Sequence, residues 1–506
     1  MGRYSDAGSA GASNAAEVSG SNVQLLRATA GVEQIAVGDL LALRGVPARA
    51  YPVRRIDYGI VSAAGAAAVA LTTVLVGNSS NLTRQRAIVD QATGDIFFAH
   101  GTVSYSGNQS GAAITKYGAA GDFIKNQVFA STGVGASDCQ TMFLSNGNIL
   151  VFWWESGGDN GKGMYFAIVD KLLNSIVAKT LVSSNVTTNP SSFAFCTALS
   201  GGGFAISWGQ AGGLFLTIRS NTGAVVFPET KVQGSPNTYS TGMFSRMVQL
   251  SNGNIFIAIA GTGKAAFAIY SPAGAVVVAF TEFGSEGYGG AEYPEVSVMA
   301  GCVCMASGTI AAVISNAGAI QGGVISLSAK RIVNDGTYFW MFDSQSAKLF
   351  VYRIPVTGLP AVKTEIPISA AITGDVIQHE IGFSVFDGNS YVLTKEFDGT
   401  LSVAEKYTGI SGGTQTIKLT DDCILTISDG NFQVTKYRNS SIFGVAQKAI
   451  AAGNMGALVQ VISGVCGSYV NALPGKSGKK FDHSASPIAG AKGAIYNNAV
   501  TFQGIA

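Results

Sequence analysis

The chain has 506 residues, of which 47% are hydrophobic and only 12% are charged, and 65 are glycine. A net charge of +2 without any dense run of Lys and Arg excludes charge-driven binding to nucleic acid or to an anionic membrane surface. Low charge with abundant glycine is typical of tightly turned β-structure whose surface is covered by neighbours or made of small polar groups.

Residues 1–81 are predicted to form an N-terminal flexible or docking arm, because they lack the repeats that follow. The first 30 or so residues are rich in Ala, Gly and Ser, which is typical of a flexible segment. The start, Met1-Gly-Arg-Tyr-Ser, lacks the basic-then-apolar pattern of a secretory signal. Residues 60–77 have about the length of a membrane span, but Ser and Thr interrupt them, so we expect a strand or a packed arm and no membrane span.

Four arginines are concentrated in this arm, among prolines at 47 and 52. They are Arg44, Arg49, Arg54 and Arg55. Two interpretations remain open: a solvated loop, or a docking contact that anchors the protein on a larger assembly.

A short phrase then recurs at nearly constant spacing. It reads Leu144-Ser-Asn-Gly147-Asn-Ile149 and again Leu250-Ser-Asn-Gly253-Asn-Ile255. Related phrases place glycines at 94, 202 and 308, so that the steps from 94 to 308 are 53, 55, 51 and 55 residues. Repeats of this length built from short strands indicate a β-propeller. Stacked β-sandwiches, the alternative, would not produce such even spacing.

The second repeat predicts four strands. They are a strand that ends at Leu144, then residues 148–154, 163–170 and 175–181. The Asn-Gly pairs predict tight hairpins in which both turn residues have positive φ. A further glycine turn, at 121, 223 and 274, is expected between the last two strands, after half-buried alternating segments such as 216–219.

After Gly308 the spacing shortens. Hairpins are predicted near 345, 388 and 422, which gives eight candidates in all. Short repeats can be incomplete blades, so we predict an all-β propeller of six to eight four-stranded blades over residues 82–440, and we favour seven. Residues 441–506 are predicted to form a small C-terminal β-module.

The six cysteines are predicted to be buried free thiols. Cys139, Cys196, Cys302 and Cys304 lie four to eight residues before a repeat glycine, on a strand where a small apolar side chain packs well. Cys302 and Cys304 are too close for an ordinary disulfide and lack partners for a zinc site.

No catalytic, metal or cofactor site is predicted. The three histidines, His100, His379 and His483, lie in different regions without ligand partners at metal-site spacing, and His100 is expected to be exposed at a strand end. The acids of the repeats stand in or next to turns, where solvated caps are favoured over catalysts; they are Glu155, Asp159, Asp170, Asp398, Asp421 and Asp422. Propeller hydrolases of the sialidase kind carry Ser-x-Asp-x-Gly-x-x-Trp turns, and the Ser145-Asn-Gly147 phrase lacks that acid.

Two tryptophans remain as contact candidates. Trp153 and Trp154 are neighbours on a strand, so their side chains point to opposite faces, and Trp208 occupies a related position in the next repeat. Burial between blades is the favoured interpretation, whereas Trp154 and Trp208 could alternatively contact a sugar ring or a subunit interface.

The C-terminal segment carries a family resemblance. Gly444-Val-Ala446, Ala451-Ala-Gly453, the Val459-Gln-Val461 strand with Ser463-Gly464, and Leu473-Pro-Gly-Lys476 follow one another. Over about 65 residues this succession resembles a small β-module near the ends of tailed-bacteriophage tail and fibre proteins. Such modules have a Leu-x-Pro-Gly turn before an aromatic strand; here the turn is one residue shorter and the next aromatic residue is Phe481.

The resemblance implies a structural component of a bacteriophage virion, in the tail nozzle or a fibre, with a role in assembly and host attachment. Its implied partners are other tail proteins, further copies of itself and a host surface glycan, and its implied location is the virion, after synthesis in the host cytoplasm. A carbohydrate-binding propeller is the alternative, and a propeller hydrolase or lyase is a weaker one.

Overall fold

The computed structural model describes a ring and a set of strands beside it. The described residues of the ring are 87–105, 109–118, 123–132, 136–155, 163–183, 194–210, 213–235, 244–260, 264–285, 294–326, 329–358, 362–378, 382–395, 399–408, 415–420, 423–428 and 431–436. Outside the ring they are 23–29, 40–44, 49–52, 442–446, 455–461, 464–466, 492–496 and 499–504. Every helix or strand assigned among these residues is a β-strand.

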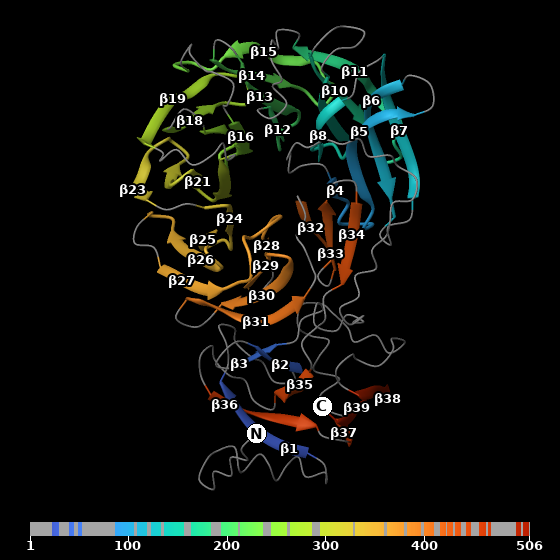
Figure 1. Ribbon diagram of the computed structural model, residues 1–506, viewed down its shortest axis with the longest axis vertical. Helices are drawn as coiled ribbons and strands as arrows, with labels where there is room; N and C mark the ends of the chain where they lie inside the picture. Colours follow the sequence, from blue (N-terminus) through green and yellow to red (C-terminus); the bar gives the residue numbers. More distant parts are fainter. Residues whose placement is uncertain are drawn as a thin grey trace.

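Seven four-stranded antiparallel sheets, called blades 1 to 7, form most of the ring (Figure 1). In every blade the strands pair in chain order, so each blade is a meander of hairpins. Blade 1 consists of β4 (Ala87–Val89), β5 (Ile96–Tyr105), β6 (Gln109–Tyr117) and β7 (Phe123–Thr132), and blade 2 consists of β8 (Ala136–Phe143), β9 (Ile149–Glu155), β10 (Gly163–Val169) and β11 (Ser175–Ser183). Blade 3 consists of β12 (Phe195–Ala198), β13 (Phe204–Gln210), β14 (Gly213–Arg219) and β15 (Val225–Lys231). Blade 4 consists of β16 (Phe244–Gln249), β17 (Ile255–Ala260), β18 (Lys264–Tyr270) and β19 (Val276–Ser285).

Blades 5 to 7 follow blade 4 in the chain. Blade 5 consists of β20 (Glu295–Met299), β21 (Cys302–Ser307), β22 (Ile310–Ser315) and β23 (Ile320–Ser326). Blade 6 consists of β24 (Arg331–Asn334), β25 (Tyr338–Gln345), β26 (Lys348–Pro355) and β27 (Val362–Pro367). Blade 7 consists of β28 (Ile377–Gln378), β29 (Gly382–Phe386), β30 (Asn389–Lys395) and β31 (Leu401–Thr408). The prediction of a β-propeller built from four-stranded blades is confirmed, and the favoured number of seven such blades agrees with these sheets.

A three-stranded sheet, the eighth sheet, lies between blade 7 and blade 1 (Figure 1). It consists of β32 (Gln415–Thr420), β33 (Cys423–Ser428) and β34 (Asn431–Lys436). Gln415 of β32 connects it to the first strand of blade 1. Its Nε2 donates to the carbonyl of Ala87 at 3.1 Å, and its Oε1 accepts from the Ala87 amide at 3.2 Å. The eighth sheet thus joins the two ends of the ring.

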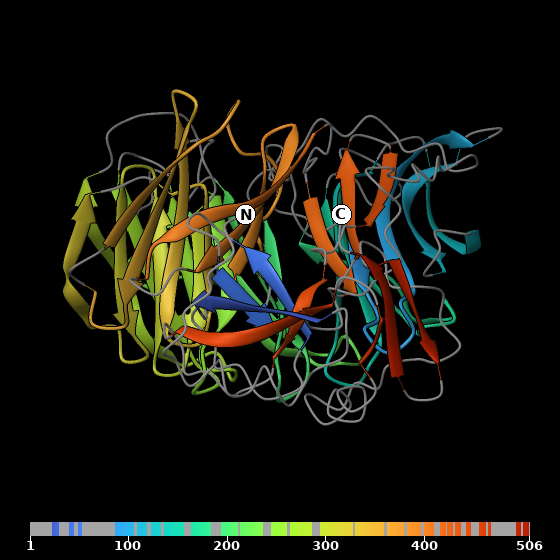
Figure 2. The same cartoon turned by 90° about the horizontal axis from the view of Figure 1, so that it is seen from below.

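The first strand of each blade lies at the centre of the ring and the fourth at its outer rim (Figure 1). The strands run between the two faces of the ring, as the edge-on view shows (Figure 2). Because neighbouring strands are antiparallel, the turns between first and second strands and between third and fourth strands share one face, which we call the turn face.

The hydrophobic core consists of separate clusters between neighbouring blades. One cluster packs Phe152 and Phe166 of blade 2 against Phe204 and Ile206 of blade 3. Every side chain of β9 and of β10 is buried. The half-buried alternation predicted for the segments before the second glycine turn is wrong at Phe267–Tyr270 of β18, where all four residues are buried, and weak at Leu216–Arg219 of β14, where three of four are buried. Blades stack face to face, so both faces of a middle strand are covered.

The repeated Asn-Gly turn differs from the predicted type. The Gly147 amide donates to the carbonyl of Leu144, and the Asn148 amide donates to the side-chain oxygen of Asn146 at 3.1 Å. Gly147 has a φ of +82°, whereas Asn146 is not among the residues with positive φ. This is a turn with glycine alone in the left-handed region, and the turn around Gly253 repeats it.

The repeat glycine at 308 is not equivalent to the four before it. Gly94, Gly147, Gly202 and Gly253 connect the first strand of a blade to the second, whereas Gly308 connects the second to the third. The predicted hairpins near 345 and 388 have the same position as Gly308. The eight candidate hairpins therefore fall in eight different sheets, although they mark two different turns.

Strands from both ends of the chain pair in one five-stranded sheet beside the ring, the terminal sheet (Figure 1). Its order is β1 (Val23–Thr29), β36 (Met455–Val461), β35 (Ile442–Ala446), β2 (Leu40–Arg44) and β3 (Arg49–Pro52). A three-stranded sheet of β37 (Gly464–Cys466), β39 (Ala499–Gly504) and β38 (Lys492–Tyr496) lies nearby. The division into 1–81, 82–440 and 441–506 stays a prediction, but the outer two segments share a sheet.

Candidate functional site: charged inner strands, inter-blade contacts and outer rim

Four charged side chains form a continuous chain across the inner strands of four successive blades. Arg246 Nη1 lies 2.8 Å from Glu295 Oε2, and Arg331 Nη1 lies 3.6 Å from Glu295 Oε1. Arg331 Nε lies 3.1 Å from Asp375 Oδ1 and donates to the Gly374 carbonyl at 2.6 Å. The first three residues stand on β16, β20 and β24, and Asp375 stands two residues before β28. We call these four residues the inner charge chain.

The inner charge chain is balanced, with two cations and two anions. Glu295 is its most buried member, with a side chain 4% exposed, while that of Arg246 is 21% exposed. Burial lowers the pKa of Arg246 from 12.5 to about 10, and the neighbouring positive charge of Arg331 adds to this, while Asp375 opposes it. The guanidinium therefore stays charged at neutral pH, and the chain can hold blades 4 to 7 together electrostatically.

A neutral side chain performs the same bridging in blade 2. Gln140 lies seven residues before Gly147, as Arg246 lies seven residues before Gly253. Its Nε2 donates to the Ala194 carbonyl at 2.8 Å and its Oε1 accepts from the Cys196 amide at 3.2 Å. This repeat position therefore reaches from the inner strand of one blade to the next, whether or not it is charged.

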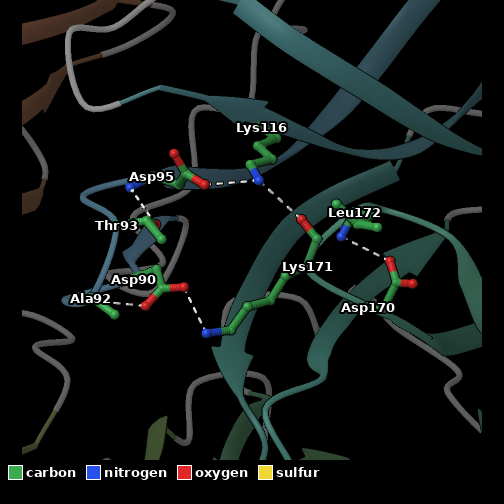
Figure 3. Close-up of polar contacts among 8 residues, drawn as sticks. All are labelled: Asp90, Ala92, Thr93, Asp95, Lys116, Asp170, Lys171 and Leu172. Atoms are coloured by element: carbon green, nitrogen blue, oxygen red, sulfur yellow. Dashed lines mark hydrogen bonds and ion pairs between the residues drawn. The ribbon is translucent and has the colours of Figure 1, made fainter.

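A second set of contacts joins blades at the turn face, and Figure 3 shows the one between blades 1 and 2. Lys171 Nζ lies 2.6 Å from Asp90 Oδ2, and Lys116 Nζ lies 2.8 Å from Asp95 Oδ2 while it donates to the Lys171 carbonyl at 3.2 Å. The hydrogen bond from Lys171 holds the pKa of Asp90 below its usual value. Asp170 caps its own turn by accepting from the amide of Leu172 at 2.8 Å, as expected for a turn acid.

The serine of the repeated phrase makes the corresponding contact in other blades. Asn221, in a turn of blade 3, donates to Ser145 Oγ of blade 2 at 3.1 Å and accepts from the Gly203 amide at 2.7 Å. Asn316 of blade 5 donates to Ser251 Oγ of blade 4 at 3.0 Å. The phrase Ser-Asn-Gly thus serves as both a turn and an inter-blade contact.

Blades 6 and 7 repeat the ionic version. Lys395 Nζ lies 2.7 Å from Asp335 Oδ2, which also accepts from Trp340 Nε1 at 2.8 Å. Burial opposes the effect, but the Lys395 hydrogen bond is foremost among the contacts that hold the pKa of Asp335 below its usual value. In four pairs of neighbouring blades, residues at the turn between the third and fourth strands of one blade therefore contact the turn between the first and second strands of the preceding blade.

Two side chains expected to be solvated are buried. His100 lies within β5 rather than at its end and is 3% exposed. Its Nδ1 lies 3.2 Å from the Gly101 carbonyl and its Nε2 lies 2.9 Å from Thr115 Oγ1. Burial lowers its pKa to about 4, so the ring is neutral at pH 7. The expectation of an exposed histidine was wrong because β5 extends five residues beyond it, to Tyr105.

Glu155 is fully buried rather than a solvated cap. Its Oε1 accepts from Trp153 Nε1 at 2.7 Å and its Oε2 lies 2.7 Å from Lys179 Nζ. Lys179 lies over the ring of Tyr165, 4.5 Å from its centroid. The carboxylate is therefore an ion-paired group within blade 2. Asp159, Asp398, Asp421, Asp422, His379 and His483 lie outside the described residues.

The candidate glycan contacts Trp154 and Trp208 are both buried, at 7% and 0% exposure. They pack in one cluster between blades 2 and 3, and Trp208 stacks on Phe215 with ring centroids 6.0 Å apart. Neither ring is open to a sugar, so their use as glycan contacts is corrected to a packing role. The favoured interpretation of burial is correct.

The four arginines of the arm are only partly described. Arg44 and Arg49 are partners at the end of the β2–β3 hairpin. Arg54 and Arg55 lie outside the described residues. The docking role of the four arginines stays a prediction.

The described thiols agree with the prediction for four cysteines. Cys139, Cys196, Cys302 and Cys304 are buried and free. Burial raises the pKa of the Cys196 and Cys304 thiols far above the ordinary value, which keeps them protonated. Among the described residues no group of His, Cys, Asp and Glu is arranged to hold a metal ion. Likewise, no helix in the described part could cross a membrane.

Large apolar side chains are exposed at matching positions on the outer rim. They cluster at the first two positions of the fourth strands of blades 1 to 4, with exposed fractions from 42% to 55%, and are Phe123, Ile124, Ile176, Val225, Val226, Val276 and Val277. We call these seven residues the rim band. Sequence reasoning missed the band, although Val225-Val226 and Val276-Val277 follow the second glycine turn at equal distances.

The outer strands of the same blades carry a repeated irregularity. Ile218 pairs with Phe227, but the next residue, Arg219, pairs with Val225, so Val226 is an extra residue. The same shift recurs in blades 1, 2 and 4. Such β-bulges twist an edge strand away from regular pairing and so hinder edge-to-edge association.

Comparisons with known proteins identify no family. No family model matches the chain, and no curated protein matches it. Among solved structures, the chain is similar to the Dos1 propeller at 12% identity and a TM-score of 0.41, over 70% of this chain and 94% of that one. It is also similar to the polysaccharide lyase Uly1 at 10% identity and a TM-score of 0.37, over 82% and 99%. Apo AztD from Citrobacter koseri gives 10% identity and a TM-score of 0.40, over 69% and 95%. These likenesses carry no inference about substrate or partner.

Proposed function

We propose that this protein is a structural component of a bacteriophage tail, in the nozzle or a fibre, which assembles with further copies of itself through the rim band. The proposal concerns assembly rather than catalysis. It rests chiefly on one observation: apolar side chains are exposed at equivalent positions on four successive blades.

The rim band is suited to side-chain contact with another protein surface. Exposed apolar side chains that gather on one part of a protein mark interaction sites, whereas singly scattered ones need no explanation. The β-bulges next to the band make simple strand addition along these edges unfavourable. A partner would therefore bury the rim side chains rather than extend the sheet.

The rim at blade 6 has a different character, which gives the ring an orientation. In blade 6 the fourth strand β27 begins with the half-buried Val362, and Lys348 and Lys363 surround Glu365 there. A ring that is apolar on one side and ionic on another contacts a copy through two different surfaces. Such head-to-tail contacts produce closed rings or fibres, the forms expected of tail parts.

The assignment to a phage tail is supported by the resemblance of residues 441–506 to the β-modules of tail and fibre proteins. The described strands β36 to β39 supply β-structure in this segment. The members of the inner charge chain pair with one another between blades, as Arg246 does with Glu295, which fits a rigid scaffold. The lectin alternative has lost its two aromatic candidates, because Trp154 and Trp208 are buried.

Self-association is tested by analytical ultracentrifugation of the full chain over a wide concentration range. We expect oligomers, and we expect the double variant Val225→Lys/Val276→Lys to shift the midpoint of association to at least tenfold higher concentration. Glu282→Lys, on the exposed outer strand β19 but away from the band, is the matched control and should leave the midpoint unchanged. A wild-type chain that stays monomeric throughout would contradict the role of the band.

The tail assignment needs a separate experiment. Antibodies raised against the purified protein should label tails of the particles produced by the host that encodes this chain, as seen by immunogold electron microscopy. Particles of a phage that lacks the gene are the control. Absence of label, together with absence of the chain from purified particles by mass spectrometry, would remove the tail assignment even if the chain self-associates.

A further inference from the structure

Among the residues that the structure describes, the eighth sheet has three strands, one fewer than each blade of the ring. In blades 1 to 7 the third strand is paired on both sides. In the described part of the chain, β34 pairs only with β33, so its outer edge has no strand against it. β34 lies on the outer side of the eighth sheet (Figure 1).

Chain spacing shows which segment corresponds to the missing strand. In blades 1 to 4, the last residue of the third strand pairs with the residue six positions later, which begins the fourth strand. These pairs are Tyr117 with Phe123, Val169 with Ser175, Arg219 with Val225 and Tyr270 with Val276. Six positions after Lys436, the last residue of β34, the chain reaches Ile442, the first residue of β35.

The bulge gives a second, independent match. In blades 1 to 4 the preceding residue of the third strand pairs nine positions ahead, as Ile218 does with Phe227. The corresponding residues of the eighth sheet are Thr435 and Gly444. In the structure, β35 keeps this irregular register against a different partner: Leu41 pairs with Gly444 and Ala42 with Ile442, and Phe443 is skipped. β2 therefore occupies, relative to β35, the place of a third strand.

The residue types agree as well. Fourth strands begin with two large apolar residues in blades 1, 3 and 4, as Val225 and Val226 illustrate. β35 begins with Ile442 and Phe443. Its sequence thus resembles that of a fourth blade strand, yet it pairs in the terminal sheet.

We propose that the outer edge of β34 is a strand-binding site whose occupant is the segment Ile442–Ala446 of the same chain. This segment exchanges between two places: the edge of β34, where it completes the eighth blade, and the terminal sheet, where it pairs with β2 and β36. When it moves to β34, the facing edges of β2 and β36 lose their partner. Those two edges then become available to a strand of another subunit.

Disulfide trapping tests the exchange. Directly opposite residues of antiparallel strands have Cα atoms about 4.5 to 5.5 Å apart, within the range that a disulfide spans. One variant carries Lys436→Cys and Ile442→Cys and traps the strand on β34; a second carries Ala42→Cys and Ile442→Cys and traps it in the terminal sheet. Cys423 pairs with Lys436 in the eighth sheet, so both variants also carry Cys423→Ser and Cys466→Ser.

The matched control is Val169→Cys with Ser175→Cys in the same background, because this pair has the same spacing within an intact blade. We expect all three variants to oxidise within single chains, as measured by intact mass and non-reducing gels. In the variant locked on β34, amide exchange in Leu40–Arg44 should become at least tenfold faster than in the variant locked in the terminal sheet.

Two outcomes overturn the proposal. If the control oxidises and the Lys436/Ile442 pair does not, the edge of β34 does not bind this segment. If that pair oxidises only between chains, the occupant is a second copy rather than the segment of the same chain. Neither outcome bears on the rim band, which is tested by ultracentrifugation of the reduced protein.

Discussion

Arg246 Nη1 and Glu295 Oε2 lie 2.8 Å apart although 49 residues separate them in the chain. The two side chains connect the inner strands of blades 4 and 5, and Glu295 is almost completely buried. A buried carboxylate is tolerated only while it is paired, so this contact determines how well the two blades stay together.

Arg246→Met should lower the free energy of unfolding by about 2 to 4 kcal/mol, because it leaves Glu295 with only the more distant Arg331 among the members of the inner charge chain. The double variant Arg246→Met/Glu295→Leu should recover much of this loss, since no unpaired charge remains. Equilibrium denaturation in urea measures both, and a double variant whose loss equals the sum of the single losses would show that the pair is not coupled.

Stability should depend on pH through His100. Its pKa falls from 6.5 in the unfolded chain to about 4 in the folded one, so the unfolded state binds the proton more readily. The stabilisation is complete above about pH 6.5 and is lost as the pH falls toward 4, at roughly 1.4 kcal/mol per pH unit and about 3 kcal/mol in total.

The comparison with His100→Gln isolates this contribution, because carboxylates titrate in both proteins. Between pH 6.5 and 4.5 the wild-type chain should lose stability faster than the variant. Parallel curves of unfolding free energy against pH would show that the imidazole is not buried as described.

The hydrogen bonds between serine and asparagine at the turn face should each contribute modestly to the free energy of unfolding. Ser145→Ala removes one hydrogen bond and should cost about 0.5 to 1 kcal/mol, whereas Asn221→Ala removes two and should cost roughly twice as much. Ser251→Ala should cost roughly twice as much as Ser145→Ala, because Ser251 Oγ accepts from both Asn316 Nδ2 and the Gly301 amide. Thermal denaturation compares the three variants, and a loss at Ser251 no larger than that at Ser145 would contradict this count of hydrogen bonds.

Two glycines with the same φ of +87° provide a matched test of blade packing. A Cβ on Gly253 would meet no atom within 4 Å, so Gly253→Ala should cost only the backbone strain, about 1 kcal/mol. A Cβ on Gly274 would lie 2.0 Å from Phe227 Cδ2 of the preceding blade. Gly274→Ala should therefore cost about 1 to 3 kcal/mol more. Equal losses in urea denaturation would mean that blades 3 and 4 do not pack closely at this turn.

Sequence spacing was sufficient to predict the propeller because the turns are local. Gly147 and Gly253 mark the same hairpin, and all four strands of blade 2 were placed within a few residues. After Gly253, it was harder to predict which glycine marks the turn between the first and second strands of a blade. Gly301, a positive-φ glycine in the first turn of blade 5, is the true equivalent, but its surroundings do not repeat the Ser-Asn-Gly phrase.

The site could be predicted only in part, because burial depends on neighbouring blades. Nothing adjacent to His100 or Glu155 in the sequence shows that both side chains are covered. The inner charge chain joins residues up to 129 positions apart, from Arg246 to Asp375, so no local motif reveals it. The apolar pairs of the rim band could have been recognised in the sequence, because they follow a recurring turn. Their exposure could not have been predicted without knowing which strand of each blade is outermost.

The pairing of β1 with β36 has a consequence for how the protein is made. Val23 faces Val461 across that ladder. Gln415 forms a hydrogen bond to Ala87, which lies 328 positions earlier in the chain, and so joins the two ends of the ring. Each blade is assembled from hairpins and can fold as it leaves the ribosome, in order from the first. The strand Val23–Thr29 must wait until residues 455–461 have been translated before its partner exists. Truncation before Met455 should therefore leave the early blades intact while it leaves the strand Val23–Thr29 without its partner, a change that proteolysis of the two proteins can detect.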